Sequence, residues 1–138
     1  MIEINNLNRE DIDLKEVETL VQSFLDNYDL PEKTVSIAFI SKEEMRKVNR
    51  DYRGKDVNTD VLSFVEDRGG DYIGEVLINY DRIKEQAKSF DNTDKEELYF
   101  ILVHGLLHLL GYKDEKDEDK EEMIKLGNHF LEKYYNQI

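Results

Sequence analysis

The chain has 138 residues, of which 32 are acidic and 19 basic, so its formal net charge is -13. This balance excludes a domain whose whole surface binds nucleic acid, because phosphate contacts need Lys and Arg, and any RNA contact must come from a local basic patch. The absence of cysteine excludes disulfides and thiolate metal ligands, which leaves His and carboxylates for any metal.

Apolar periodicity and length predict a single folded domain over residues 1–138. The longest apolar run is shorter than the ~18–20 residues that span a bilayer, so no membrane contact is expected. The N-terminus lacks the basic start and apolar stretch of a signal or transit peptide, and we therefore expect a cytoplasmic protein. The sequence does not indicate an oligomeric state.

The first half of the chain predicts a helix, a strand and a second helix. Apolar residues recur at three- and four-residue steps over 12–28, the stripe of an amphipathic helix. The β-branched, apolar run at 34–40 is typical of a buried strand. Ser41 and Glu44 have the spacing of a capping box, which predicts a helix over 42–52.

A polar segment, residues 53–60, separates these elements from a predicted β-hairpin. It lacks helical periodicity and is rich in turn formers, which indicates an ordered loop. Two β-rich runs at 61–65 and 72–79, joined by the turn-forming residues 66–71, predict the hairpin.

Three helices are predicted after the hairpin, over 81–89, over 94–110 and through an apolar stripe from Met123 to Tyr134. The second of them is apolar on every side from Leu98 onward, which is typical of a helix buried at the centre of a fold. The predicted fold class is therefore α+β, with a small mixed sheet packed against helices around this central helix.

Two histidines stand four residues apart in the predicted central helix. His104 and His108 share one helical face, and Gly111 ends the helix so that Asp114 can return a carboxylate to the same point. Three such ligands leave the fourth position of tetrahedral zinc open, as in a catalytic site. We therefore predict one zinc ion per chain, bound by His104, His108 and Asp114. The opposing interpretation is a pair of core histidines that are satisfied by hydrogen bonds.

Gly105 weakens a second alternative, a zinc metallopeptidase-like hydrolase. Zinc peptidases of the HExxH type place a glutamate after the first histidine as general base, and glycine occupies that position here. Glycine inside a helix costs ~1 kcal/mol relative to alanine, which indicates the close approach of a neighbouring element or a ligand.

Three segments together resemble the YbeY family of bacterial endoribonucleases, also called rRNA maturation factors. They are HGLLHLLGY at 104–112, RGKDVNTDVLSF at 53–64 and YIGEVLI at 72–78, and their order and spacing extend the resemblance over most of the chain. The resemblance implies a compact α+β fold, a zinc ion held by three side chains and cleavage of single-stranded RNA. It further implies roles in 16S rRNA 3′ end maturation and in ribosome quality control, with small-subunit rRNA and ribosome components as partners.

The family's metal ligands map onto His104, His108 and position 114, and an arginine implicated in its activity maps onto Arg53. The family usually has Asp-His where this chain has Lys113 and Asp114. A carboxylate is a competent zinc ligand, so Asp114 is expected to replace the histidine. Its charge is expected to make a zinc-bound water less acidic.

Other positions also depart from the family or offer alternatives. Asn58 and Val65 occupy positions where the family favours proline, which we expect to loosen the loop. Glu115 and Asp117 are alternative ligands to Asp114, and His129 is assigned to packing within the last helix.

A basic stretch in the predicted helix at 42–52 and the loop after it offers a local RNA contact. Arg46, Arg50 and Arg53 recur at helical steps, so they can follow one side leading to the metal, or form an ordinary solvated face. The hydroxyls and carboxylate of the loop and hairpin can bind substrate or simply hold the loop; these residues are Thr59, Asp60 and Ser63. A further alternative is a non-catalytic ribosome-assembly factor with a structural zinc.

Overall fold

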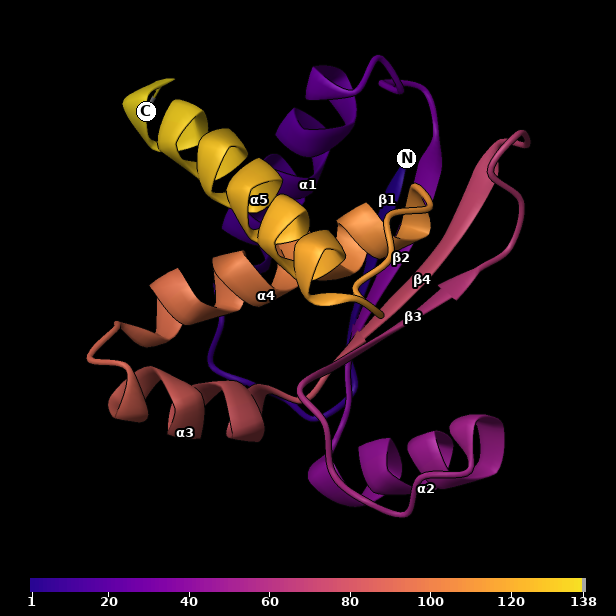
Figure 1. Cartoon of the computed structure of the whole chain (residues 1–138), viewed down its shortest axis with the longest axis vertical. Helices are drawn as coiled ribbons and strands as arrows, with labels where there is room; N and C mark the ends of the chain where they lie inside the picture. The colour runs from indigo at the N-terminus through magenta and orange to yellow at the C-terminus, as the bar shows by residue number, and fades with distance from the viewer. Residues whose placement is uncertain (138) are drawn as a thin grey trace.

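A four-stranded mixed sheet and five helices make up residues 1–137, which the computed structural model describes (Figure 1). In chain order the elements are β1 (Ile2–Asn6), α1 (Leu14–Asn27), β2 (Thr34–Phe39), α2 (Lys42–Arg53), β3 (Val61–Val65), β4 (Tyr72–Ile78), α3 (Tyr80–Ser89), α4 (Asp94–Leu109) and α5 (Asp117–Gln137). The predicted α+β class is confirmed. Within residues 1–137, no helix is both long and apolar enough to cross a membrane.

The strand β1 corrects the sequence-based prediction, which places no element before residue 12. The sheet order is β1-β2-β4-β3, with β1 and β4 parallel to β2 and with β3 antiparallel to β4 as the predicted hairpin. Ile2 and Ile4 of β1 pack against the core, whereas Glu3 and Asn5 are exposed. Such a short edge strand is stabilised by pairing with β2, a contact distant in sequence that local pattern does not reveal.

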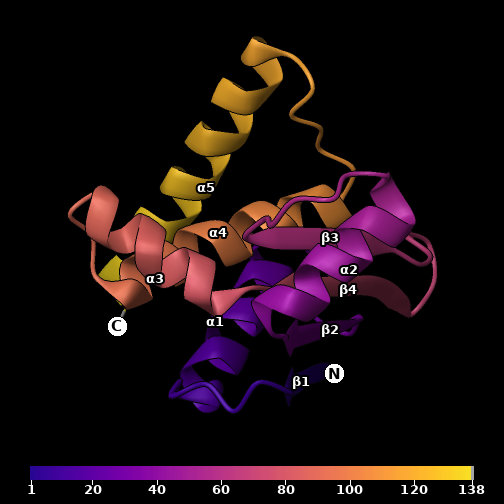
Figure 2. The same ribbon diagram turned by 90° about the horizontal axis from the view of Figure 1, so that it is seen from below.

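Helices cover both faces of the sheet, and each face has its own apolar cluster. On one face, α1, α4 and α5 enclose the larger core, in which Leu102 and Leu106 of α4 are buried. On the other face Met45 of α2 packs against Leu62 and Leu77. The view from below shows α2 in front of β3 and β4, with α4 behind them (Figure 2).

The alternation of side chains along β3 determines what faces the central helix. Leu62 belongs to the α2 side of the sheet, whereas Val61 packs with the larger core and the Ser63 hydroxyl donates to the Gly105 carbonyl at 2.8 Å. A Cβ at Gly105 would lie 2.8 Å from Val76 Cγ1, so the sheet leaves no room for a side chain there. The predicted close approach at Gly105 is therefore made by the hairpin.

Both ends of α4 are capped. Thr93 and Glu96 form a complete capping box at its start, where Thr93 Oγ1 accepts from the Glu96 amide at 3.0 Å. At its end the Tyr112 amide donates to the Leu107 carbonyl and the Gly111 amide to the His108 carbonyl, which is a Schellman motif. Gly111 has a φ of 105°, a conformation that favours glycine. The chain therefore reverses here, as the sequence predicts.

Candidate metal centre and substrate cavity

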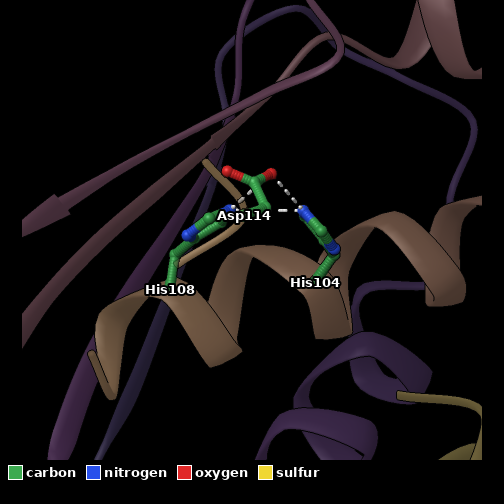
Figure 3. A group of neighbouring side chains, drawn as sticks. All are labelled: His104, His108 and Asp114. Atoms are coloured by element: carbon green, nitrogen blue, oxygen red, sulfur yellow. Dashed lines mark hydrogen bonds and ion pairs between the residues drawn. The ribbon is translucent and has the colours of Figure 1, made fainter. Parts of the chain in front are cut away.

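The reversal at Gly111 brings the three predicted metal ligands together. His104 Nε2 lies 3.2 Å from Asp114 Oδ2 and 3.2 Å from His108 Nε2, and His108 Nε2 lies 3.4 Å from Asp114 Oδ2. The two imidazoles rise from one face of α4, and the carboxylate meets them from the loop (Figure 3). Each of the three offers one ligand atom to a common point.

These spacings fit a metal ion. For tetrahedral zinc with ligand bonds of about 2.0–2.1 Å, neighbouring ligand atoms are separated by about 3.3 Å, which matches the three distances. Lone pairs of two neutral imidazoles and a carboxylate repel one another at this range unless a proton or cation lies between them. The donor set of two nitrogens and one oxygen suits zinc, and it leaves one coordination position for solvent or substrate.

The protonation states also suit a cation. Burial, and then the proximity of His108, lower the pKa of His104 despite the opposing carboxylate of Asp114. Burial alone would raise the pKa of Asp114, but its contacts with His108 and His104 outweigh burial and hold that pKa below its usual value. Near pH 7 the site therefore presents a neutral imidazole and an ionised carboxylate, the forms that bind metal.

The orientation of His108 is fixed by the backbone. Its Nδ1 lies 3.0 Å from the carbonyl oxygen of Tyr112, which can only accept a hydrogen bond, so Nδ1 carries the proton. The lone pair is then on Nε2, which faces His104 and Asp114. The Schellman turn thus supplies both the third ligand and the group that orients the second.

A cavity of about 530 Å³ surrounds this cluster. It brings together most of the residues that the sequence analysis singles out for substrate, namely Arg53, Thr59, Asp60 and Ser63. Arg53 ends α2, and Gly54 follows as its left-handed cap with a φ of 68°, which leads the chain into the loop. Within residues 1–137 no hydrogen bond or ion pair holds the Arg53 guanidinium, so it can bind an anion in the cavity.

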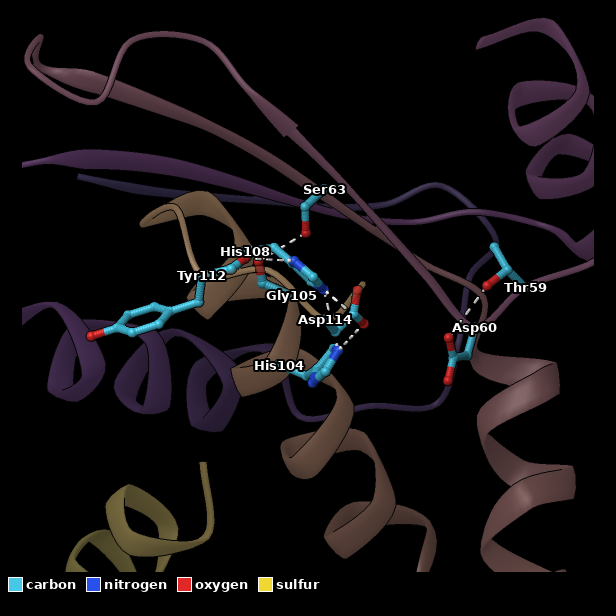
Figure 4. A network of polar contacts seen from close by, with 8 residues as sticks. All are labelled: Thr59, Asp60, Ser63, His104, Gly105, His108, Tyr112 and Asp114. Carbon is cyan, nitrogen blue, oxygen red and sulfur yellow. Dashed lines mark hydrogen bonds and ion pairs between the residues drawn. The ribbon is translucent and has the colours of Figure 1, made fainter. Parts of the chain in front are cut away.

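Asn79 positions the loop, a role that sequence reasoning missed. This buried residue caps α3 and donates from Nδ2 to the Thr59 carbonyl at 3.1 Å, while its own amide donates to the Asp60 carbonyl at 2.9 Å. Figure 4 shows the Asp60 carboxylate to one side of His104, His108 and Asp114, next to the Thr59 hydroxyl. The Ser63 hydroxyl, by contrast, already donates to the Gly105 carbonyl.

The predicted contacts Arg46 and Arg50 lie outside this cavity. Arg46 Nε donates to Asp56 Oδ1 at 2.9 Å, and an Arg50 nitrogen lies 3.9 Å from the same oxygen. Neither arginine is among the residues that line the cavity. The structure therefore does not bring them together with Arg53, because Arg46 pairs with Asp56 while Arg50 lies near Asp56 and nearer still to Asp51, whose Oδ1 is 3.4 Å from Arg50 Nε.

Three other cations line the cavity in their place. They are Arg68, Lys113 and Lys120, which no pattern in the sequence singles out. Arg68 comes from the hairpin turn, and its Nε donates to the Leu109 carbonyl at the end of α4. The alternative ligands Glu115 and Asp117 do not belong to the group of converging ligand atoms, which within residues 1–137 consists of His104, His108 and Asp114. His129 is exposed on α5, so its assignment to packing is wrong.

Comparison with known proteins agrees with this geometry. The family model "Endoribonuclease YbeY" matches residues 3–135. The chain belongs to the YbeY family. Proteins named "Endoribonuclease YbeY" from Bacillus velezensis and Bacillus subtilis are 40% and 36% identical to it, and each match covers 88% of this chain and 85% of the relative. The solution structure of TM1509 from Thermotoga maritima is similar with a TM-score of 0.70 and 28% identity, over 99% of this chain and 91% of that protein.

Proposed function

We propose that this chain is a zinc-dependent endoribonuclease that hydrolyses single-stranded RNA. The relatives carry the name endoribonuclease, and the observation that carries the proposal is the convergence of His104, His108 and Asp114 in a cavity that is also lined by cationic side chains. Its biological substrate would be small-subunit rRNA, in 16S rRNA 3′ end maturation and ribosome quality control in the cytoplasm. Residues 1–138 would act as one domain with one zinc ion.

His104, His108 and Asp114 would hold the zinc ion, which when bound supplies a Lewis acid and lowers the pKa of water for attack at neutral pH. Arg53 would donate two parallel hydrogen bonds to the phosphoryl oxygens and stabilise the charge that develops on them. The Asp60 carboxylate faces the same cavity and would accept a hydrogen bond from the attacking water or a ribose hydroxyl. Thr59 would hold that carboxylate in place, since its hydroxyl lies 3.5 Å from Asp60 Oδ1.

Lys113 and Lys120 would bind backbone phosphates on either side of the reacting one. Both line the cavity, whereas Arg46 and Arg50 would contact RNA only away from it, once released from Asp56. The salt dependence of RNA affinity distinguishes the contributions of the lysine pair and the arginine pair. Each lost phosphate contact lowers the slope of log affinity against log salt by ~0.7 for a single strand. Neutralising Lys113 and Lys120 should lower it by about 1.4, and neutralising Arg46 and Arg50 by less.

Metal content and cleavage in matched variants test the proposal. Purified wild-type protein should contain about one zinc per chain by mass spectrometry and cut single-stranded but not double-stranded RNA. His108→Ala and Asp114→Ala should stay folded by circular dichroism and lose both zinc and cleavage. Arg53→Ala should keep zinc and lose cleavage, while Arg46→Ala serves as the control arginine.

A further variant, His104→Ala, distinguishes this function from a non-catalytic assembly factor with a structural zinc. If His104→Ala unfolds and the wild type binds RNA without cutting it, the assembly factor is the correct interpretation. The imidazoles of His104 and His108 are partly exposed to a cavity, with side-chain exposures of 21% and 27%, which favours a reactive site over a closed structural one.

A further inference from the structure

A second cavity adjoins the first and shares part of its wall. Its volume is about 440 Å³, within the ~300–1,000 Å³ range of small-molecule sites. Its walls are mainly apolar and aromatic, with one charged group, and include Tyr28, Leu30, Arg68, Ile73, Leu110 and Tyr112. Arg68 and Tyr112 also line the cavity around the metal ligands, so a chain molecule bound in one cavity can continue into the other.

Tyr112 lines both cavities, and its backbone and its ring make different contributions. Its carbonyl accepts the hydrogen bond from His108, and its amide is held by the Leu107 carbonyl at 3.2 Å. Its ring points away from the metal ligands (Figure 4) and is 38% exposed. Burial and the nearby Tyr112 raise the pKa of Tyr28, which agrees with the two phenols facing one space. The hydrogen-bonded turn therefore holds the backbone of Tyr112 and presents its aromatic ring beside the candidate metal centre.

The charge of this cavity selects an anionic chain with flat apolar groups. Arg68 is the one charged residue among the described residues that line it, in a protein whose net charge is -13. The Arg68 guanidinium lies over Gly111, where an added Cβ would be 3.5 Å from Cζ, and its Nε is fixed by the Leu109 carbonyl at 3.1 Å. Within residues 1–137 no hydrogen bond or ion pair holds its terminal nitrogens, and Arg68 lines both cavities. An aromatic face beside a fixed guanidinium matches a nucleobase and its phosphate.

We propose that the second cavity receives an unstacked base of the RNA, stacked on Tyr112, while Arg68 binds a phosphate between this base and the metal centre. The inference rests on the proposed function, because the strand that enters this cavity is the one placed at the metal ligands. The cavity would then select RNA whose bases can be splayed apart and would reject a duplex, in which every base is stacked. An apolar side chain of a protein partner is the alternative occupant, and it would leave RNA binding indifferent to Tyr112.

A scan with abasic nucleotides tests the base directly. Zinc-loaded protein is titrated on ice into labelled RNA of about ten uridines, the length of a typical single-strand site, with one base removed at each position in turn. A gel confirms that the RNA stays intact. Removal of the base at one position should lower RNA affinity about tenfold, since a stacked base raises affinity by a factor of about 5 to 150.

The expected pattern depends on the aromatic face at position 112. Tyr112→Phe should keep the sensitive position, whereas Tyr112→Ala and the bulkier Tyr112→Leu should bind intact and abasic RNA alike. Tyr72 is the matched control, because its exposure of 37% is close to the 38% of Tyr112 and it lies outside both cavities. Tyr72→Ala should therefore show the wild-type scan.

Three results overturn the inference, and they show whether the nuclease function fails with it. If wild-type protein binds and cuts RNA but no abasic position matters, or the sensitive position persists in Tyr112→Leu, the base lies elsewhere and the nuclease function stands. If wild-type protein neither binds nor cuts RNA, the proposed function fails and the base site fails with it.

Discussion

The replacement of Gly105 by alanine tests whether side chains of the hairpin pack directly on the backbone of α4. An alanine Cβ would lie 2.8 Å from Val76 Cγ1, 3.0 Å from Val61 Cγ2 and 3.3 Å from Ser63 Oγ. Overpacking of this kind costs about 1–3 kcal/mol, and alanine recovers ~1 kcal/mol through its higher helix propensity. We therefore expect Gly105→Ala to lower the free energy of unfolding by about 1 kcal/mol and at most about 2.

Gly127 of α5 is the matched control for this substitution. It is also a buried helical glycine, but a Cβ there would meet only Val103 Cγ1, at an ordinary contact distance of 3.7 Å. Gly127→Ala gains the helix propensity without the clash and should raise the free energy of unfolding by about 0.5–1 kcal/mol. The two chemically identical substitutions should thus differ in sign.

Urea denaturation followed by circular dichroism measures both values, in chelator to separate folding from metal binding. Because Gly105 lies between the two histidines of α4, a helix pushed away from the sheet should also weaken zinc binding in Gly105→Ala and not in Gly127→Ala. Equal stabilisation by both substitutions would show that α4 stands farther from the sheet than the structure places it, and would refute the reasoning.

The remaining predictions concern the metal ligand, the buried tyrosine and the helix cap. Asp114→His should move the pH optimum of cleavage downward, because a more positive site makes the zinc water more acidic, and an unchanged pH profile would contradict this. Glu115→Gln should retain the zinc that Asp114→Asn loses, as measured by mass spectrometry. Burial raises the pKa of Tyr99, so the stability it contributes is complete below pH ~10 and falls as pH rises further; Tyr99→Phe should flatten that alkaline loss in urea titrations. Thr93→Ala should lower the free energy of unfolding by ~1 kcal/mol, and a loss near zero would mean that the capping box does not stabilise the protein.

The convergence of His104, His108 and Asp114 could be predicted from the sequence because its geometry is local. A four-residue step on a helix, a glycine that ends it and a carboxylate three residues later all follow from the periodicity and termination of one helix. The structure adds the hydrogen bond from His108 to the Tyr112 carbonyl, which the pattern did not specify. The helix itself was predictable for the same reason, since Leu98 and the residues after it are apolar all round.

The parts that sequence reasoning missed depend on contacts distant along the chain. The strand β1 is stabilised by β2, about thirty residues away, and its own residues carry little β signal. Arg68 reaches the cavity because the hairpin folds its turn onto the end of α4, and its Nε donates to the Leu109 carbonyl there. The helical spacing of Arg46 and Arg50 was correct, but Arg46 pairs with Asp56 in the following loop, and Arg50 lies near both Asp51 and Asp56.

The acidic chain can still bind RNA because the cavity has more cations than carboxylates, although the chain as a whole is negatively charged. Four cations line the cavity, Arg53, Arg68, Lys113 and Lys120, against the two carboxylates of Asp60 and Asp114. These groups sum to +2, that is +4 from the cations and -2 from the carboxylates, and a bound divalent ion would raise the sum to +4, while the whole chain carries -13. A field of opposite sign confined to one cavity attracts a single strand there and repels it elsewhere, so binding should be localised at the metal centre and should weaken steeply with salt.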